Sequence, residues 1–240
     1  SGGGADGSET PNVDRIKAAG KLVMMTNATF PPFEYVKGGE VQGVDPELAK
    51  LIAAELGVEL EIIDMDFDLL TAAVQSGKGD LVAAGMTVDE ERKQQVDFSV
   101  PYVDTTLYII APTGSTISGA ADLAGLTISV QEATTSDLYV QDNVEGANIL
   151  AFKDAVATGD AVKNDKADVA VIDELTGKSI VAANPDALML LEEPLTVEQY
   201  AMAIKKDSPD LLTVVNKVLE AQVAEDNVNK LIAEHMELAK

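Results

Sequence analysis

The 240-residue chain contains no cysteine, no tryptophan and a single histidine, His235. Without cysteine the chain can form no disulfide, thiolate nucleophile or cysteine metal site. With one histidine, a histidine-rich metal centre or a Ser-His-Asp triad is not expected either. No apolar run approaches the roughly 18 residues that a membrane-spanning helix needs. We therefore expect no metal and no cofactor.

Basic residues are scarce beside acidic ones, with 17 Lys and Arg against 41 Asp and Glu and a formal charge of -24. Such a field repels nucleic acid and anionic lipid, so neither is expected as a direct ligand. We interpret the charge as conferring solubility, and it does not imply a cationic substrate. The 46% hydrophobic and 24% charged fractions are ordinary for a soluble globular protein.

Arginine is the rarest basic side chain, because Arg15 and Arg92 are the only two in the sequence. Arg92 lies five residues after Thr87, which follows Ala84-Gly85-Met86. A guanidinium can hold a carboxylate with two parallel hydrogen bonds, and lysine cannot match that geometry. The pattern predicts a small anion site at a strand-to-helix junction. The alternative is that residues 90–93 form only a solvated helical turn.

The first part of the chain alternates predicted strands and helices. Residues 22–26 and 58–63 are predicted strands, and Asp45 is a predicted N-cap for a helix that Gly57 ends. A helix over 67–76 and a strand over 81–84 follow, leading directly to Thr87. This alternation predicts an α/β fold with a largely parallel sheet, whose ligands lie at the carboxyl ends of strands.

A second alternation begins after the turn-rich segment at residues 112–115. It runs over residues 127–184 and is followed by a predicted strand over 200–204 and a long helix that starts at Pro209. The chain therefore divides into two α/β units rather than one long sheet.

Several short motifs occur in a fixed order along the chain. They are Thr26–Tyr35, Gly43–Ala49, Met65–Asp68, Ala84–Arg92, Val96–Ser99 with Pro101-Tyr102, Val130–Ser136 and Ala167–Glu174. In this order and spacing the sequence resembles the bacterial extracellular solute-binding proteins of family 3, the polar amino-acid receptors of ABC importers. The resemblance extends from about Lys21 to the C-terminus.

The resemblance implies a two-lobed, periplasmic-binding-protein-like clamp of type II, in which each lobe is a mostly parallel sheet flanked by helices. The first lobe is expected over 16–103 and 200–240 and the second over 108–195. The hinge strands are expected near 102–107 and 199–203. Hinged closure around a ligand is typical of such proteins.

A zwitterionic amino acid needs cationic and amide donors on one side and a carboxylate on the other. Arg92, Thr87 and Gly85 match the first need, and Thr135 begins a predicted helix whose amide can reach the same carboxylate. The resemblance assigns the ligand's ammonium to Asp173 and to the Ala84 carbonyl. For Asp173 the alternative is an ordinary helix N-cap.

Two aromatic and two amide side chains complete the predicted site. The resemblance places Phe30 and Phe67 on either side of the ligand side chain, although ordinary core packing is the alternative. Asn27 and Gln131 are the predicted specificity residues. Because an amide both donates and accepts, the pair favours a neutral polar ligand such as glutamine, with arginine or lysine as the alternative.

The same resemblance sets the remaining expectations. We expect a non-catalytic monomer outside the cytoplasmic membrane, periplasmic or lipid-anchored to its outer face, with free amino acid and an ABC permease as partners. The weaker alternatives are a cyclohexadienyl dehydratase-like enzyme with Glu132 as its acid, and the sensor lobe of a signalling receptor. Residues 1–15 are expected to form a flexible tether, with an expression tag as the alternative for residues 1–10.

Overall fold

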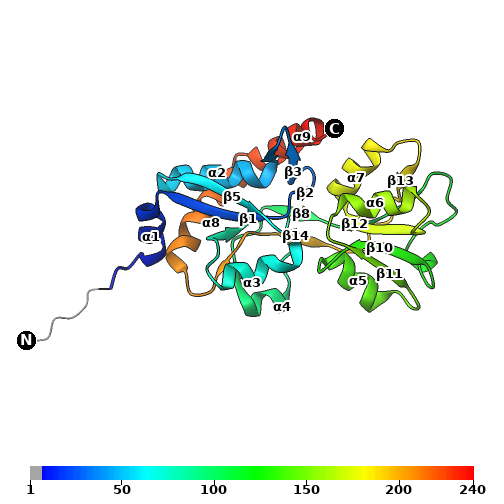
Figure 1. The fold of residues 1–240 in the computed structure, drawn as a ribbon, viewed down its shortest axis with the longest axis horizontal. Helices are drawn as coiled ribbons and strands as arrows, with labels where there is room; N and C mark the ends of the chain where they lie inside the picture. The colour runs from blue at the N-terminus through cyan, green and yellow to red at the C-terminus, as the bar shows by residue number, and fades with distance from the viewer. Residues whose placement is uncertain (1–6) are drawn as a thin grey trace, which may run out of the picture.

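The structure, a computed structural model, describes residues 7–240. These residues form two lobes that lie side by side and are joined by two extended segments (Figure 1). We call the half built around residues 21–26 the first lobe and the half built around residues 127–131 the second lobe.

The first lobe contains segments from both ends of the chain. Its elements are α1 (Pro11–Ala19), β1 (Lys21–Thr26), β2 (Thr29–Phe30), β3 (Glu34–Lys37), β4 (Glu40–Gln42), α2 (Val44–Leu56), β5 (Glu59–Asp64), a 3-10 turn (Phe67–Leu69), α3 (Leu70–Gln75), β6 (Leu81–Val82), α4 (Glu90–Gln95), β7 (Val96–Phe98), β15 (Ala203–Lys205), α8 (Pro209–Ala224) and α9 (Asn227–Leu238). The main sheet has the order β5-β1-β6-β15-β7, and β2, β3 and β4 form a separate small antiparallel sheet.

The second lobe is one continuous segment. Its elements are β9 (Leu107–Pro112), a 3-10 turn (Ala120–Asp122), β10 (Thr127–Gln131), α5 (Thr135–Asn143), β11 (Asn148–Phe152), α6 (Val156–Lys163), β12 (Val169–Asp173), α7 (Glu174–Ala183) and β13 (Leu188–Leu190). The strand order is β11-β10-β12-β9-β13.

The two main sheets share one plan. In each, the first three strands are parallel, and the fourth strand runs antiparallel to both of its neighbours. All strands but one in each sheet therefore point the same way, which matches the mostly parallel sheets predicted from the sequence. The carboxyl ends of β1 and β6 and those of β10 and β12 lie where the two lobes meet (Figure 1).

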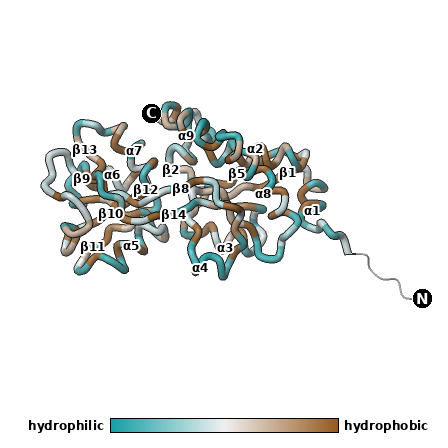
Figure 2. Tube along the Cα trace, turned by 180° about the vertical axis from the view of Figure 1, so that it is seen from behind, coloured by the Kyte–Doolittle hydropathy of each residue, from teal (hydrophilic) through white to brown (hydrophobic). Residues whose placement is uncertain are grey.

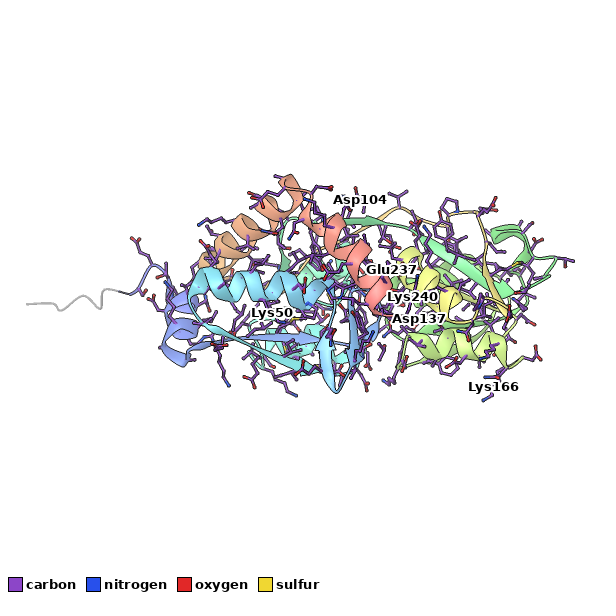
Figure 3. The ribbon with its side chains drawn as sticks, turned by 90° about the horizontal axis from the view of Figure 1, so that it is seen from above. Lys50, Asp104, Asp137, Lys166, Glu237 and Lys240 are labelled. Carbon is purple, nitrogen blue, oxygen red and sulfur yellow. The ribbon has the colours of Figure 1, made fainter. Side chains whose placement is uncertain are left out.

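Two short strands connect the lobes. β8 (Val103–Thr105) pairs with β14 (Glu198–Tyr200), and the Gln199 side chain donates to Asp104 at 2.8 Å. Figure 3 shows Asp104 over this connection. The single strand predicted over 200–204 is divided here. Pairing with β8 ends at Tyr200, and the chain crosses through Ala201 and Met202 before β15 joins the first sheet.

Apolar periodicity explains the longer helices. Leu48, Ile52 and Leu56 recur every four residues along α2 and are almost completely buried. Gly57 ends the helix in the left-handed conformation at φ 71°, which glycine adopts without a steric penalty. Figure 2 shows the result, with hydrophobic residues gathered inside each lobe and hydrophilic residues outside.

The N-cap predicted at Asp45 is wrong. The N-cap of α2 is Gly43, and Asp45 lies inside the first turn with no exposed surface. Its carboxylate accepts hydrogen bonds from the Gly85 amide at 2.8 Å and from the Tyr102 hydroxyl. A tertiary role has therefore replaced the local capping role that the sequence pattern favours.

The tether predicted over 1–15 is wrong for Pro11–Arg15, which belong to α1. Val13 and Ile16 are buried, and the amides of Asn12 and Val13 donate to Asp210 at the start of α8, both at 2.8 Å. Two apolar residues and one carboxylate hold this short helix against the first lobe. So few residues give no pattern in the sequence from which the helix could be predicted. The part of the predicted tether at residues 1–6 lies outside the described residues.

Candidate functional site

All ten residues that the sequence analysis proposes for the site line one cavity between the lobes. The lining residues are Asn27, Phe30, Phe67, Ala84, Gly85, Thr87, Arg92, Gln131, Thr134, Thr135 and Asp173. Thr134 is the one that the sequence analysis missed, although it directly precedes Thr135. The free volume is about 10 Å³, roughly what a single water molecule needs. The lobes meet around this cavity, and the Arg92–Ala133 and Gln131–Asn27 hydrogen bonds cross from one lobe to the other.

Arg92 is held at the end of this cavity by both lobes. Its side chain donates through Nη1 to the Thr87 carbonyl at 2.7 Å and through Nη2 to the Ala133 carbonyl of the second lobe at 3.1 Å. Asp89 lies 3.6 Å from Nε and also caps α4 by accepting the Arg92 amide at 2.7 Å. The solvated-turn alternative is wrong for Arg92, whose residue is only 9% exposed.

The Cζ atom of the Arg92 guanidinium lies over the Phe67 ring, 5.4 Å from the ring centroid. A cation over an aromatic face is attracted by the ring quadrupole. Burial lowers the pKa of Arg92, and the surrounding carboxylates of Asp89, Glu198 and Asp173 oppose that shift. Arginine stays charged in proteins even when its pKa falls, so the cavity contains a fixed, desolvated cation.

The turn at Ala133 presents the start of α5 to the cavity. Ala133 adopts the left-handed conformation at φ 65°, which is strained for a residue with a Cβ. Its amide donates to Asp137 at 3.0 Å while its carbonyl accepts from Arg92. Asp137 is labelled in Figure 3 on the second lobe. The turn leaves Thr134 and Thr135 lining the cavity at the N-terminal end of the helix, where free amides attract anions.

Asp173 supplies the opposite charge. It ends β12, is 4% exposed and accepts a hydrogen bond from the Tyr200 hydroxyl. Burial raises the pKa of Asp173 to about 7, with a further contribution from Glu198, whereas the Tyr200 hydrogen bond and Arg92 oppose the shift. Asp173 also occupies the N-cap position of α7, but its side chain makes no capping hydrogen bond. The helix-cap alternative therefore does not explain where its side chain points.

The two predicted specificity residues bind each other across the lobes. Gln131 donates through Nε2 to Asn27 Oδ1 at 2.8 Å and to the Lys153 carbonyl at 3.1 Å. Asn27 Oδ1 also accepts from the Thr29 hydroxyl at 2.8 Å, and Asn27 Nδ2 donates to the Met65 carbonyl at 2.9 Å. A ligand side chain that reaches this end must exchange one of these bonds for its own.

At the floor of the cavity, the Phe30 ring packs closely against Gly85. Gly85 has φ 53°, and a Cβ placed there would lie 2.9 Å from the Phe30 ring. Phe30 lines the cavity, whereas Phe33 is fully buried behind it and packs edge-on against Tyr200 with centroids 5.0 Å apart. Glycine is required at position 85 both by its conformation and by the approach of Phe30.

A buried carboxyl pair behind the floor was not found from the sequence. Asp45 accepts the Gly85 amide, and Glu34 lies near Asp45 with neither of its oxygens bonded in suitable geometry among the described residues. Burial, and then the charge of Asp45, raise the pKa of Glu34 well above its ordinary value. Because Asp45 already accepts two hydrogen bonds, we assign the proton to Glu34. A polar residue between the apolar Phe33 and Tyr35 was the only signal in the sequence.

Replacing Glu34 by glutamine is expected to remove a pH-dependent loss of stability. A raised pKa in the folded state stabilises the protein fully below the unfolded pKa of about 4.3 and is lost as pH rises toward the folded pKa. As pH rises above that unfolded value, the unfolding free energy of the wild type should fall relative to that of Glu34→Gln, by up to about 1.4 kcal/mol per pH unit. Urea unfolding at several pH values measures the difference in unfolding free energy between variant and wild type. Glu40→Gln, at an exposed position, is the control. Parallel curves for Glu34→Gln and the wild type would contradict the assignment.

Residues 7–240 contain no group of three or more Asp, Glu or His side chains placed to hold a metal ion. None of the helices in this part of the chain combines the length and the apolar character required to cross a membrane.

Comparison with known proteins identifies a family and similar structures. The profile of the bacterial extracellular solute-binding proteins, family 3, matches residues 22–237. The arginine-binding extracellular protein ArtP of Bacillus subtilis (strain 168) is 34% identical over 218 residues, which cover 88% of this chain and 84% of that protein.

Two solved structures extend the comparison to the fold. The amino-acid ABC transporter substrate-binding protein AbpA of Streptococcus pneumoniae, solved with L-arginine, has a TM-score of 0.90 at 33% identity and covers 94% of this chain and 98% of its own. An ancestral arginine-binding protein, solved with bound glutamine, has a TM-score of 0.84 at 36% identity, with coverages of 90% and 97%.

Proposed function

The chain belongs to the bacterial extracellular solute-binding proteins of family 3, and we propose that it captures one polar amino acid between its lobes and delivers it to the membrane permease of an ABC importer. Its two lobes have the type II periplasmic-binding-protein fold, as do the similar structures. Relatives named as amino-acid-binding proteins support the ligand class.

The observation that carries the proposal is the arrangement of charge in the cavity. Arg92, with Thr87 and the Thr135 amide, provides donors for a carboxylate, and Asp173 provides the acceptor for an ammonium. Both charged groups are desolvated and lie at the junction of the lobes. A free α-amino acid carries these two charges next to each other, so it can neutralise both groups at once.

Contacts that span the two lobes would also hold the lobes closed around a ligand. The Arg92–Ala133 and Gln131–Asn27 hydrogen bonds already join the lobes. A ligand replaces them with bonds of its own and holds the lobes together through its charges. We propose the antiparallel β8–β14 pair as the hinge, with the first lobe over 16–103 and 200–240 and the second over 108–195. The helix α1 extends the first lobe to Pro11.

The ligand side chain is expected to lie between Phe30 and Phe67 and to meet Asn27 and Gln131. A neutral amide such as that of glutamine matches these two amides in hydrogen-bonding character. Arginine is the second candidate, because ArtP and AbpA are named or solved as arginine binders, and the ancestral protein was solved with both arginine and glutamine.

The position of Glu132 does not favour the enzymatic alternative. Glu132, the proton donor that a dehydratase-like reaction requires, does not line the cavity and is ion-paired with Lys153 at 2.7 Å. A binding role without catalysis is therefore proposed. The family also favours a location outside the cytoplasmic membrane. Anchoring through a lipid and a monomeric state remain part of the same proposal.

Thermal unfolding in the presence of each amino acid tests the function. At about 100 times its dissociation constant, a ligand of the folded state adds roughly 2.7 kcal/mol of stability. The melting temperature should rise by several degrees for the cognate ligand and little for others.

Asn27→Asp tests the proposed side-chain contact in the same experiment. The added carboxylate should move the ranking toward lysine and arginine. Because this variant also loses the bond to the Met65 carbonyl, the ranking and not the absolute shift is the readout. An unchanged ranking would place Asn27 outside the ligand contact, and a flat response to every amino acid would contradict the proposed function.

A further inference from the structure

A second, larger pocket, which is open to solvent, adjoins the ligand cavity at Asn27. It has a volume of about 330 Å³ and is lined by Asn27, Thr29, Asp64, Met65, Asp66, Lys153 and Asp154. Asn27 is the one residue that lines both spaces. We call the larger space the outer cavity. A ligand side chain that displaced the Asn27–Gln131 hydrogen bond would face the outer cavity.

The outer cavity is lined by three carboxylates and one ammonium. Asp64 and Asp154 have structural partners, because Asp64 accepts the Ala28 amide at 2.9 Å and Asp154 accepts the Val156 amide at 2.7 Å. Lys153 is the only cation among the lining residues. Lys153 therefore reduces the net negative charge of the outer cavity.

Lys153 is fixed in place by both lobes. Its Nζ lies 2.9 Å from Asp68 of the first lobe and 2.7 Å from Glu132 of the second lobe. Its carbonyl also accepts the Gln131 side chain, which ties Lys153 to the predicted specificity pair. Hydrogen bonds to Glu132 and Asp68 raise the pKa of Lys153, so the ammonium stays charged at neutral pH.

We propose that Lys153 is a specificity-determining residue that neutralises the acidic end of the binding site and thereby disfavours a cationic ligand side chain. The inference rests on the proposed amino-acid-binding function and concerns the choice among amino acids. Lys153 shares the lining of the outer cavity with Asp64, Asp66 and Asp154, so its charge offsets carboxylates that a ligand guanidinium or ammonium group would otherwise meet there. Its own charge also repels such a group directly.

The charge of Lys153 acts at moderate strength. The side chain is 52% exposed, so solvent and salt screen its interactions. An effect of about fivefold in relative affinity is expected at low ionic strength, and it should shrink as salt is added. The charge of Lys153 should not change the affinity of a neutral ligand of the same shape.

A purely structural role makes a different prediction. If Lys153 only latches the closed lobes through Asp68 and Glu132, its loss weakens every ligand by the same factor. The ratio of two affinities separates the roles, provided that the two ligands differ in charge and little else. Arginine and citrulline are such a pair, because citrulline replaces the guanidinium with a neutral urea group of nearly the same size.

The experiment is calorimetric titration of wild type, Lys153→Gln and Lys178→Gln with arginine and citrulline at low and high salt, using displacement where binding is weak. Lys178 is the matched control, since it is 49% exposed and paired with Glu174 at 2.7 Å on the same lobe but does not line either cavity. Lys153→Gln should raise the preference for arginine over citrulline by about fivefold or more at low salt, and Lys178→Gln should leave it unchanged.

Three results would overturn the inference. They are equal changes for both ligands, no change for either, or a shift of the ratio toward citrulline. Failure of the proposed function is a separate outcome, because the wild type would then respond to no amino acid in the thermal panel before any variant was compared.

Discussion

Replacing Arg92 by lysine is expected to weaken amino-acid binding at least tenfold, or by about 1.4 kcal/mol. Lysine keeps the charge, but its single ammonium lacks the planar fork with which a guanidinium can donate to the Thr87 carbonyl and hold a ligand carboxylate at the same time. It also loses the contact between the guanidinium and the Phe67 ring. Calorimetry of the cognate amino acid measures the effect.

Arg15→Lys provides the matched control for Arg92→Lys. Arg15 is the other arginine of the chain and forms an ion pair with Asp80 at 2.8 Å, with 58% of its side chain exposed. It lies outside the cavity, so its replacement should leave affinity unchanged. Equal affinities for wild type and Arg92→Lys, with normal melting temperatures, would show that Arg92 holds the lobes rather than the ligand.

Replacing Asp173 by asparagine is expected to have the larger effect, about a hundredfold loss of affinity or roughly 3 kcal/mol. The variant leaves the ligand's ammonium desolvated without a counter-charge. Asparagine preserves the size of the side chain and an acceptor for the Tyr200 hydroxyl, so the fold should be retained. The ligand-free variant should be at least as stable as the wild type above pH 7, because a carboxylate that burial destabilises has been removed.

The raised pKa of Asp173 also predicts a pH dependence of binding. A ligand ammonium needs the ionised carboxylate, which forms as pH rises through about 7 in the ligand-free protein. Affinity should therefore increase with pH across this range and then level off, and Asp173→Asn should show no such increase. Asp168→Asn, at the opposite end of β12, is the control. Full binding by Asp173→Asn would contradict the ammonium role.

The family resemblance predicts the cavity residues, and the strand pattern explains why several of them lie together. Thr26 ends β1 just before Asn27, Gln131 ends β10 and Asp173 ends β12, so the rule for carboxyl ends of strands brings them together. The longer helices follow from apolar spacing in the same way, as Leu48, Ile52 and Leu56 illustrate.

The features that the sequence did not reveal depend on distant contacts. Asp45 sits in a good capping pattern, yet it binds Gly85, which is 40 residues away in the sequence. The pKa of Glu34 is raised only because the fold buries it beside Asp45. In the sequence Lys153 looks like an ordinary surface residue, and only the folded structure shows that it pairs with Asp68. Strands of two or three residues such as β2 and β13 are too short for any periodicity.

We propose that Arg92 and Asp173 together bind one free amino acid. The most direct test is calorimetric titration of protein that has been unfolded, freed of carried-over ligand and refolded. The titrants are the amino acid that gives the largest thermal shift, its carboxamide and its N-acetyl derivative. We expect one ligand per chain for the free amino acid and a loss of at least tenfold for each blocked form, since each removes one of the two charges. Binding of the three compounds with equal affinity, or no binding of any amino acid, would contradict it.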